Sequence, residues 1–307
     1  MEGKTNVYTA GCCRDGAGIT SACYWENETK VDLHPSNTYW SYASDIALCD
    51  GTILSAGTYS GGNDTRACCW KNGRILDLPA GKCESEAKAV TTADGNVYVA
   101  GVFSENHLTN ACYWVDGERI CLPADGCDSD ARSIAVSGGK VYVAGTFTKD
   151  GVVKSCYWVD GEKIDLPLSK GSDAFAITLP NGKVYAVGYY SEDDKIYFPC
   201  YWVDGQRIDL ACNNATSASA YAMAVSGAKI YVAGYYYNGT NKACYWADGK
   251  IFDLAENFSA RDITVLNDKV YIAGFGGGKA CYWIDGEKTE LPGGIRGAKA
   301  LSIAVEE

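Results

Sequence analysis

The chain of 307 residues has a net charge of −11, with 27 Lys and Arg against 38 Asp and Glu. A protein that binds nucleic acid needs a basic surface to displace the counterions of the phosphates, and no Lys/Arg cluster is present, so DNA or RNA is not expected as a partner. The sequence has no apolar run of about 18 residues, so no membrane-spanning helix is predicted and membrane insertion is not expected.

The first predicted strand covers residues 7–11, and the motif Cys-Tyr-Trp follows it at residues 23–25. This motif, with one copy that reads Cys-Cys-Trp, occurs seven times along the chain. Its seven tryptophans are separated by 45, 44, 44, 44, 44 and 37 residues: Trp25, Trp70, Trp114, Trp158, Trp202, Trp246 and Trp283. A repeat of about 44 residues is in the range of the blades of a β-propeller.

Residues 131–166 form the best-preserved unit and contain four strand-like runs, at 131–136, 141–145, 156–159 and 163–166. All four runs are rich in β-branched and aromatic residues, and Asp160-Gly161 between the last two is a strong signal for a two-residue hairpin. No segment shows the periodicity of an amphipathic helix. Each unit therefore predicts one four-stranded antiparallel blade.

The two ends of the chain predict how the ring closes. Residues 5–33 begin a blade at its second strand, while residues 300–305 repeat the pattern of a first strand with nothing after it. We expect residues 297–307 to complete the blade begun by residues 5–33, because this leaves no strand edge unpaired. The expected fold is all-β: a single seven-bladed β-propeller over residues 1–307, with four antiparallel strands per blade.

The repeated Trp and Cys are interpreted as packing residues. A tryptophan at one fixed place in every blade suits contacts between blades, and equivalent cysteines of adjacent blades are expected to lie too far apart for a disulfide. We expect these cysteines to be reduced and structural: Cys23, Cys68, Cys112, Cys156, Cys200, Cys244 and Cys281. No Cys-x-x-Cys pair occurs, so no zinc site is predicted.

The loops on the two faces of the ring differ in how much they vary. Short, uniform turns join the first strand to the second and the third to the fourth, whereas the second-to-third loops and the links between blades differ in length and chemistry. Because variable loops on a rigid scaffold tend to carry function, we place the binding surface on the second face.

The residue after the first Ala of each innermost strand varies most, and it is expected at the mouth of the central channel. We predict a ligand-binding site there, formed by Ser44, Lys88, Arg132, Phe175, Tyr221 and Arg261 with Leu301, and helped by nearby loop aromatics that include Trp40, Tyr190 and Tyr236. Exposed aromatic and charged side chains suit sugar rings or a protein partner. The alternative is a solvated loop surface with scattered aromatics.

Other chemical signals are weak. Asp125, Asp128 and Asp130 align beside Glu84 and Glu86 of the previous blade, but their spacing matches no Ca²⁺ loop, and a solvated acidic rim is the preferred interpretation. His34 and His107 occupy unrelated repeat positions and have no evident catalytic partner. No catalytic residue, metal or cofactor is predicted.

The blade pattern resembles that of a family of bacterial repeat propellers built on Tyr-Trp-x-Asp-Gly. It is seen here in residues 230–235 with 243–249 and in residues 141–145 with 156–161, and the resemblance covers nearly the whole chain. Such proteins are mostly secreted or attached to the cell surface, and the family implies no catalytic residues. Residues 1–6 show no signal peptide, although a mature chain would look the same, and 15 cysteines favour a reducing compartment, so both locations stay open.

The sequence therefore predicts a non-enzymatic binding propeller that captures a carbohydrate, another small molecule or a protein at the channel mouth. The alternatives are a glycan-active enzyme that uses loop carboxylates and a scaffold for protein interactions. For the first hypothesis, Arg132→Ala is expected to weaken ligand binding without unfolding the protein.

Overall fold

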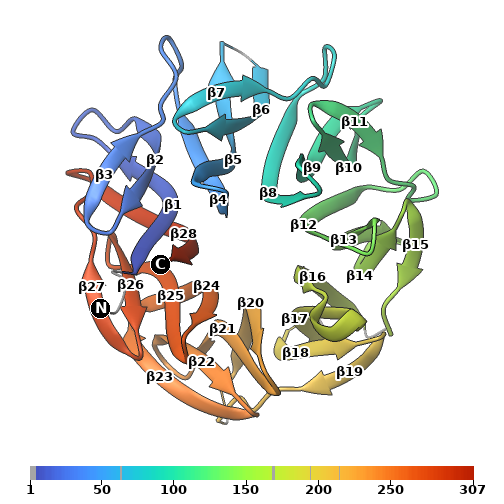
Figure 1. Ribbon diagram of the computed structural model, residues 1–307. Helices are drawn as coiled ribbons and strands as arrows, with labels where there is room; N and C mark the ends of the chain where they lie inside the picture. Colours follow the sequence, from blue (N-terminus) through green and yellow to red (C-terminus); the bar gives the residue numbers. More distant parts are fainter. Residues whose placement is uncertain (1–4, 63, 168–169, 194, 214) are drawn as a thin grey trace.

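The computed structural model shows seven four-stranded antiparallel sheets arranged as blades around a central axis (Figure 1). The predicted all-β, seven-bladed propeller is thus confirmed, and the one helical element among the described residues is the 3₁₀ turn η1 (Pro180–Gly182). The structure describes residues 5–62, 64–167, 170–193, 195–213 and 215–307. Residues 1–4, part of the segment in which no signal peptide is expected, lie outside this range, as do residues 194 and 214 of two variable loops. No helix in the described ranges is long and apolar enough to cross a membrane.

The strands of each blade follow one another in order from the channel outward. Blade 1 contains β28 (Gly297–Glu306), β1 (Asn6–Arg14), β2 (Thr20–Glu26) and β3 (Thr29–Asp32). Blade 2 contains β4 (Ser41–Cys49), β5 (Thr52–Gly61), β6 (Asp64–Lys71) and β7 (Arg74–Asp77). Blade 3 contains β8 (Ser85–Ala93), β9 (Asn96–Glu105), β10 (Leu108–Val115) and β11 (Glu118–Cys121). Blade 4 contains β12 (Ser129–Ser137), β13 (Lys140–Lys149), β14 (Val152–Val159) and β15 (Glu162–Asp165).

The remaining three blades have the same order. Blade 5 contains β16 (Gly171–Thr178), β17 (Tyr185–Ser191), β18 (Phe198–Val203) and β19 (Gln206–Asp209). Blade 6 contains β20 (Ser217–Ser226), β21 (Lys229–Tyr237), β22 (Asn241–Ala247) and β23 (Lys250–Glu256). Blade 7 contains β24 (Phe258–Leu266), β25 (Lys269–Gly276), β26 (Lys279–Ile284) and β27 (Glu287–Glu290).

The Asp-Gly turns form the hairpins that the sequence predicts. In blade 4, Asp160 and Gly161 both have positive φ angles, of 48° and 83°, which a type I′ turn requires. The Asp160 side chain also accepts a hydrogen bond of 2.9 Å from the backbone N–H of Val141. The same carboxylate therefore shapes the outer hairpin and ties it to the second strand of the blade.

The hydrophobic core lies between the blades, where the repeated Trp and Cys side chains are buried. All seven tryptophans are at most 1% exposed, and the seven repeated cysteines are fully buried. The indole N–H of Trp114 donates to the backbone oxygen of Pro79, in the link that leaves the preceding blade, at 3.0 Å. Trp158 makes the same bond to Pro123 at 2.8 Å. Trp25 and Trp246 make the equivalent bond, so four of the tryptophans tie neighbouring blades together by a hydrogen bond. The indole N–H groups of Trp70, Trp202 and Trp283 have no such partner among the described residues.

The C-terminal strand closes the ring. β28 pairs antiparallel with β1 and supplies the innermost strand of blade 1, so the predicted closure is observed (Figure 1). Ser302 on β28 lies between the innermost strands of both neighbouring blades: its Oγ is 2.6 Å from Asp45 Oδ1 on β4 and 2.7 Å from Asp262 Oδ2 on β24. β28 is therefore held by its backbone pairing with β1 and by the contacts of Ser302 with β4 and β24.

Candidate functional site

Each innermost strand contains a β-bulge at the same place. In blade 4, Ala131 pairs with Gly145 and Ser133 pairs with Ala144, so Arg132 between them has no partner on the second strand. A bulge bends its strand and redirects the side chain of the extra residue. The equivalent shift in every blade leaves these seven residues unpaired: Ser44, Lys88, Arg132, Phe175, Tyr221, Arg261 and Leu301. They are the positions that vary most in the sequence.

A glycine of the second strand makes room for each bulge. A Cβ built on Gly145 would overlap the carbonyl oxygen of Asp130, directly upstream of the bulge, and one built on Gly188 would overlap that of Asp173. Backbone atoms cannot move aside as a flexible side chain can, so only glycine fits. The glycine of the second strand therefore allows one side chain per blade to be presented to the axis.

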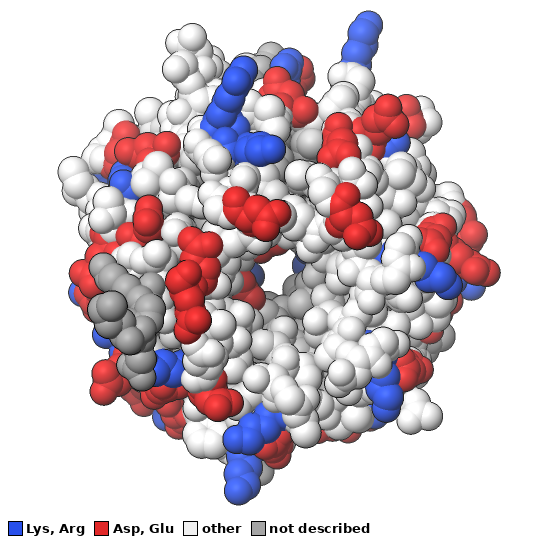
Figure 2. Space-filling view, in the orientation of Figure 1, with Lys and Arg blue, Asp and Glu red and all other residues white. Residues whose placement is uncertain are grey.

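The seven bulge residues line a single cavity at the mouth of the central channel. It has a volume of about 330 Å³, and Tyr42 and Glu86 complete its wall. This volume lies in the range of small-molecule sites. Figure 2 shows the channel open at the centre of the ring.

An ion-pair ladder covers the wall of the mouth from blade 3 to blade 5. Lys88 Nζ lies 2.6 Å from Asp130 Oδ1, and Arg132 Nε lies 3.3 Å from Asp130 Oδ2. The guanidinium of Arg132 then reaches Asp173 on the next blade at 3.1 Å. Two of the three cations in the mouth are thus neutralised by carboxylates of the same wall.

Asp173 is the most buried carboxylate of this ladder, with 7% of its side chain exposed. Burial raises its pKa from 3.8 to about 6, while Arg132 opposes the rise. Its second oxygen, Oδ1, has no hydrogen-bond partner among the described residues. The stability of the ionised form therefore depends on Arg132.

Aromatic side chains occupy the mouth between blades 5 and 6. The ring centroids of Phe175 and Tyr221 are 5.0 Å apart in an edge-to-face contact, and Tyr221 stacks on Tyr235 at 5.8 Å. Arg261 places its guanidinium carbon 3.8 Å from the centre of the Tyr221 ring, at the distance of a cation–π contact. Within the described part of the chain Arg261 makes no ion pair, unlike Lys88 and Arg132.

Three predicted site residues do not line this cavity. Trp40 stacks on Tyr42 at 5.6 Å and lies beside the wall. Tyr190 and Tyr236 are 8% and 3% exposed, and their hydroxyls donate to Asp209 and Asp253 of the outermost strands at 3.3 and 3.0 Å. Because side chains alternate along a strand, the preceding residues Tyr189 and Tyr235 join the aromatic cluster instead.

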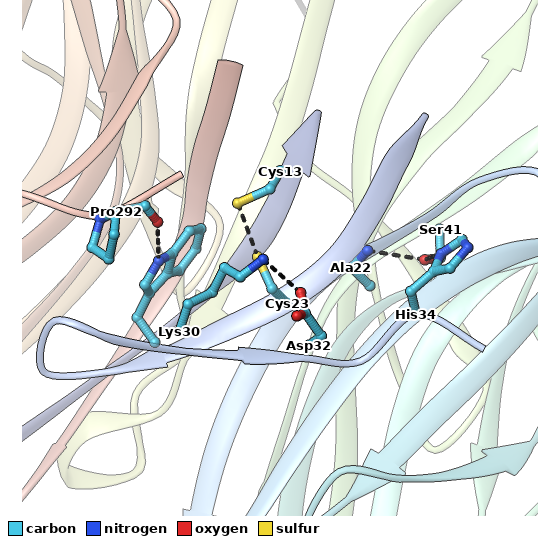
Figure 3. A network of polar contacts seen from close by, with 9 residues as sticks. Cys13, Ala22, Cys23, Lys30, Asp32, His34, Ser41 and Pro292 are labelled. Carbon is cyan, nitrogen blue, oxygen red and sulfur yellow. Dashed lines mark hydrogen bonds and ion pairs between the residues drawn. The ribbon is translucent and has the colours of Figure 1, made fainter. Parts of the chain in front are cut away.

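The close contact of His34 with a serine is structural. The Ser41 hydroxyl lies 2.7 Å from His34 Nδ1 and accepts a 2.9 Å bond from the backbone N–H of Ala22 (Figure 3). Ser41 is fully buried. The equivalent residues Ser85 and Ser129 accept the same backbone bond, and neither bonds a histidine among the described residues. A substrate cannot reach such a hydroxyl, so this pair is no nucleophile and base.

Two thiols also meet inside blade 1. Cys13 Sγ on β1 and Cys23 Sγ on β2 are 3.5 Å apart, as free thiols (Figure 3). The hydrogen bond from Cys23 lowers the pKa of Cys13 to about 7. Both side chains are buried, at 5% and 0% exposure, so this pair belongs to the core.

The acidic residues of the predicted rim do not gather around one point. Asp130 is part of the ion-pair ladder, Asp128 accepts the backbone N–H of Thr109 at 2.8 Å, and Asp125 pairs with Lys163 at 3.4 Å. Among the described residues, no three His, Cys, Asp or Glu side chains come together as a metal site would require.

The chain matches no protein-family model and no curated protein sequence. Solved structures with the same fold include TolB from Acinetobacter baumannii, with 12% identity, a TM-score of 0.52 and coverage of 97% of this chain and 66% of TolB. A puromycin-hydrolyzing peptidase from Mycobacterium tuberculosis has 11% identity, a TM-score of 0.57 and coverage of 90% and 49%. The periplasmic gluconolactonase of Pseudomonas aeruginosa has 12% identity, a TM-score of 0.54 and coverage of 98% and 99%.

The chain thus spans about two thirds of TolB, about half of the peptidase and nearly all of the gluconolactonase. At these identities the likeness shows the propeller fold alone, because propellers carry many unrelated functions.

Proposed function

We propose that this protein is a non-enzymatic binding propeller that captures a small polar ligand at the channel mouth, with carbohydrates as the first class to test. One observation carries the proposal. Seven side chains, one per blade and different in chemistry, are directed by repeated bulges into a single cavity of about 330 Å³. A scaffold that only had to be stable would have no need for this variety at one repeated position.

The chemistry of the mouth suits a ring that carries hydroxyl or acidic groups. The ring of Phe175 suits the apolar face of a sugar ring. Tyr221 supports it from the side, since the faces of Tyr221 contact Tyr235 and Arg261. Arg261 offers N–H donors that no carboxylate of the described residues occupies. The ion-pair ladder holds Lys88 and Arg132 in fixed positions on the adjoining wall, where the guanidinium carbon of Arg132 lies 5.0 Å from the centre of the Phe175 ring.

Binding fits this cavity better than hydrolysis of a glycan. Glycosidases use two carboxylates on either side of the bond that is cleaved. Among the described residues that line the cavity, Glu86 is the one acidic side chain. The nearby Asp130 and Asp173 are engaged by Lys88 and Arg132. The resemblance to the bacterial repeat propellers, which implies no catalytic residues, supports the same choice.

A thermal-shift screen of neutral and acidic sugars tests this function, because a ligand that binds only the folded state raises its stability. A sugar that binds is then titrated against the variants Tyr221→Ala and Arg261→Gln. We expect each substitution to weaken binding about tenfold, which corresponds to about 1.4 kcal/mol.

Two matched controls lie outside the cavity. Tyr237 is an aromatic residue that is 41% exposed at the end of β21, and Arg74 is an exposed cation on β7. Tyr237→Ala and Arg74→Gln should leave the affinity unchanged. If no sugar stabilises the protein, or if the control variants weaken binding as much as the mouth variants, the assignment is wrong.

A further inference from the structure

A second, larger cavity lies beside blade 7, apart from the channel mouth. It has a volume of about 510 Å³ and is formed by segments of blades 6, 7 and 1. Its wall includes Phe275, the end of the hairpin at Gly276–Gly278, and three basic residues. None of the seven bulge residues lines it.

Short connections of blade 7 leave this space open. Asn257 alone joins β23 to β24, whereas residues 122–128 make the equivalent link between β11 and β12. Only Gly277 and Gly278 join β25 to β26, with φ angles of 56° and 78°. The shorter spacing from Trp246 to Trp283 reflects these connections, and the segments around Arg14 and Arg296 border the resulting hollow.

The charge of the hollow is opposite to that of the chain. Arg14, Arg296 and Lys299 line it, and no acidic residue does so among the described residues. Within those residues none of the three cations forms an ion pair, and Arg14 bonds only to the backbone oxygen of Gly18, at 3.0 Å. In a protein with a net charge of −11, three unpaired cations around one cavity form a local site of attraction for an anion.

The inner wall adds an apolar surface and brings no opposing charge. Lys299 Nζ lies 5.0 Å from the centre of the Phe275 ring. Cys12 also lines the cavity, and burial raises the pKa of its thiol to about 11, so the thiol is neutral at pH 7. A ligand in this hollow would contact the ring of Phe275 with an apolar part and the three cations with a negatively charged group.

We propose that the hollow between blades 6, 7 and 1 binds a small organic anion, whose carboxylate or phosphate group contacts Arg14, Arg296 and Lys299 while an apolar part contacts Phe275. The recognition is electrostatic at one end and apolar at the other. The hollow shares no lining residue with the channel mouth, and the guanidinium carbon of Arg261 in the mouth lies 6.0 Å from the centre of the Phe275 ring.

Calorimetric titration with phenyl phosphate, benzoate and benzyl alcohol tests this site. The first two probes combine a ring with a phosphate or a carboxylate and so distinguish the two acidic groups, and the alcohol is the neutral control. We expect an anionic probe to bind and the alcohol not to bind. The affinity of the anion should fall as the salt concentration is raised from about 50 to about 200 mM, because salt screens exposed charges. The backbone amide signals of Gly276, Gly277 and Gly278 should shift on binding.

Arg14→Gln and Lys299→Gln should each weaken the anionic probe about tenfold, the usual effect of losing one charge-assisted hydrogen bond. Lys279→Gln is the matched control. Lys279 follows Gly278 in the hairpin that borders the cavity, but it pairs with Glu290 at 2.7 Å and does not line the cavity. The proposal is overturned if neither anion binds, if benzyl alcohol binds equally well, or if Lys279→Gln weakens binding as much as the two cavity variants. The sugar screen with Tyr221→Ala reports on the mouth alone, so failure at one site is distinguishable from failure at the other.

Discussion

At the level of single residues, the presentation of each mouth side chain depends on the glycine opposite its bulge. Gly145 faces the backbone of Asp130 so closely that a methyl group would overlap the carbonyl oxygen. Gly145 does not have a positive φ angle. A glycine is required here because the two backbones lie so close together.

Gly145→Ala is expected to destabilise the protein by about 1–3 kcal/mol, as overpacking usually does, because the bulge that carries Arg132 has to shift. Urea unfolding measures this effect as a lower midpoint. Gly16→Ala is the matched control, since its new methyl would meet only the end of the Ile295 side chain at 3.6 Å. Equal midpoints for the two variants would contradict the role of the glycine.

Arg132 has a second role that the sequence does not reveal. It neutralises the buried Asp173 at 3.1 Å as well as lining the mouth. Replacement of Arg132 would therefore change stability together with binding, so the expectation that Arg132→Ala leaves folding intact does not follow from the structure. Arg261, which has no such partner among the described residues, is the better probe of the mouth.

The pKa of Asp173 tests this role. Because its folded-state pKa of about 6 lies above the ordinary 3.8, its contribution to stability is largest below about pH 4 and falls as the pH rises toward 6. Arg132→Gln should raise the pKa of Asp173 above 6 and extend this fall to higher pH, which an NMR titration of the carboxyl carbon measures. Arg207→Gln is the control: it removes the cation that pairs with Asp209, which is 54% exposed, and should leave the pKa of Asp173 unchanged. An unchanged Asp173 pKa in Arg132→Gln would refute the coupling.

At the level of elements, alternation along the second strands decides which aromatics reach the mouth. Tyr189 and Tyr190 are adjacent in β17, yet the first contacts Phe175 and the second bonds Asp209 in the outer part of the blade. The sequence places both near the variable loops and does not fix which one faces the axis. A shift of one residue exchanges the two faces, and here that shift separates a mouth residue from a packing residue.

The closing strand β28 is held by a proton-sensitive contact. Ser302 has one hydroxyl hydrogen but lies within 2.7 Å of oxygens from both Asp45 and Asp262. Both contacts can be hydrogen bonds only when one carboxyl group carries a proton and donates it to Ser302. Burial, and then the charge of Asp262, raise the pKa of Asp45 to about 7, and burial also raises that of Asp262.

This contact makes ring closure weaker as the pH rises. The folded state holds the proton of Asp45 more tightly than the unfolded chain does, so the free energy of unfolding should fall between about pH 4 and pH 7. Asp45→Asn keeps the shape of the side chain but removes its titration, and urea unfolding across this range should then show a smaller fall. Identical pH profiles for the variant and the original protein would rule out the shared proton.

At the level of the whole molecule, the period and the chain ends were enough to predict the ring, because each blade repeats one pattern of Trp, Cys, Ala and Gly. The variation at residue 132 and its equivalents also pointed to the cavity at the channel mouth, which all seven of these residues line. The cavity around Arg14 and Arg296 was not predictable, because its wall combines loops of three blades. Its one trace in the sequence is the spacing of 37 residues between the last two tryptophans.

Ligand binding at the mouth formed by the bulge residues can be tested by a map of backbone amide shifts, recorded on titration with a sugar found in the screen. If the sugar binds there, the largest shifts should cluster at Phe175, Tyr221 and Arg261 and disappear in Tyr221→Ala. Shifts confined to the outermost strands or to the Asp-Gly turns, with the mouth signals unmoved, would place the ligand elsewhere and refute the proposed function of the mouth.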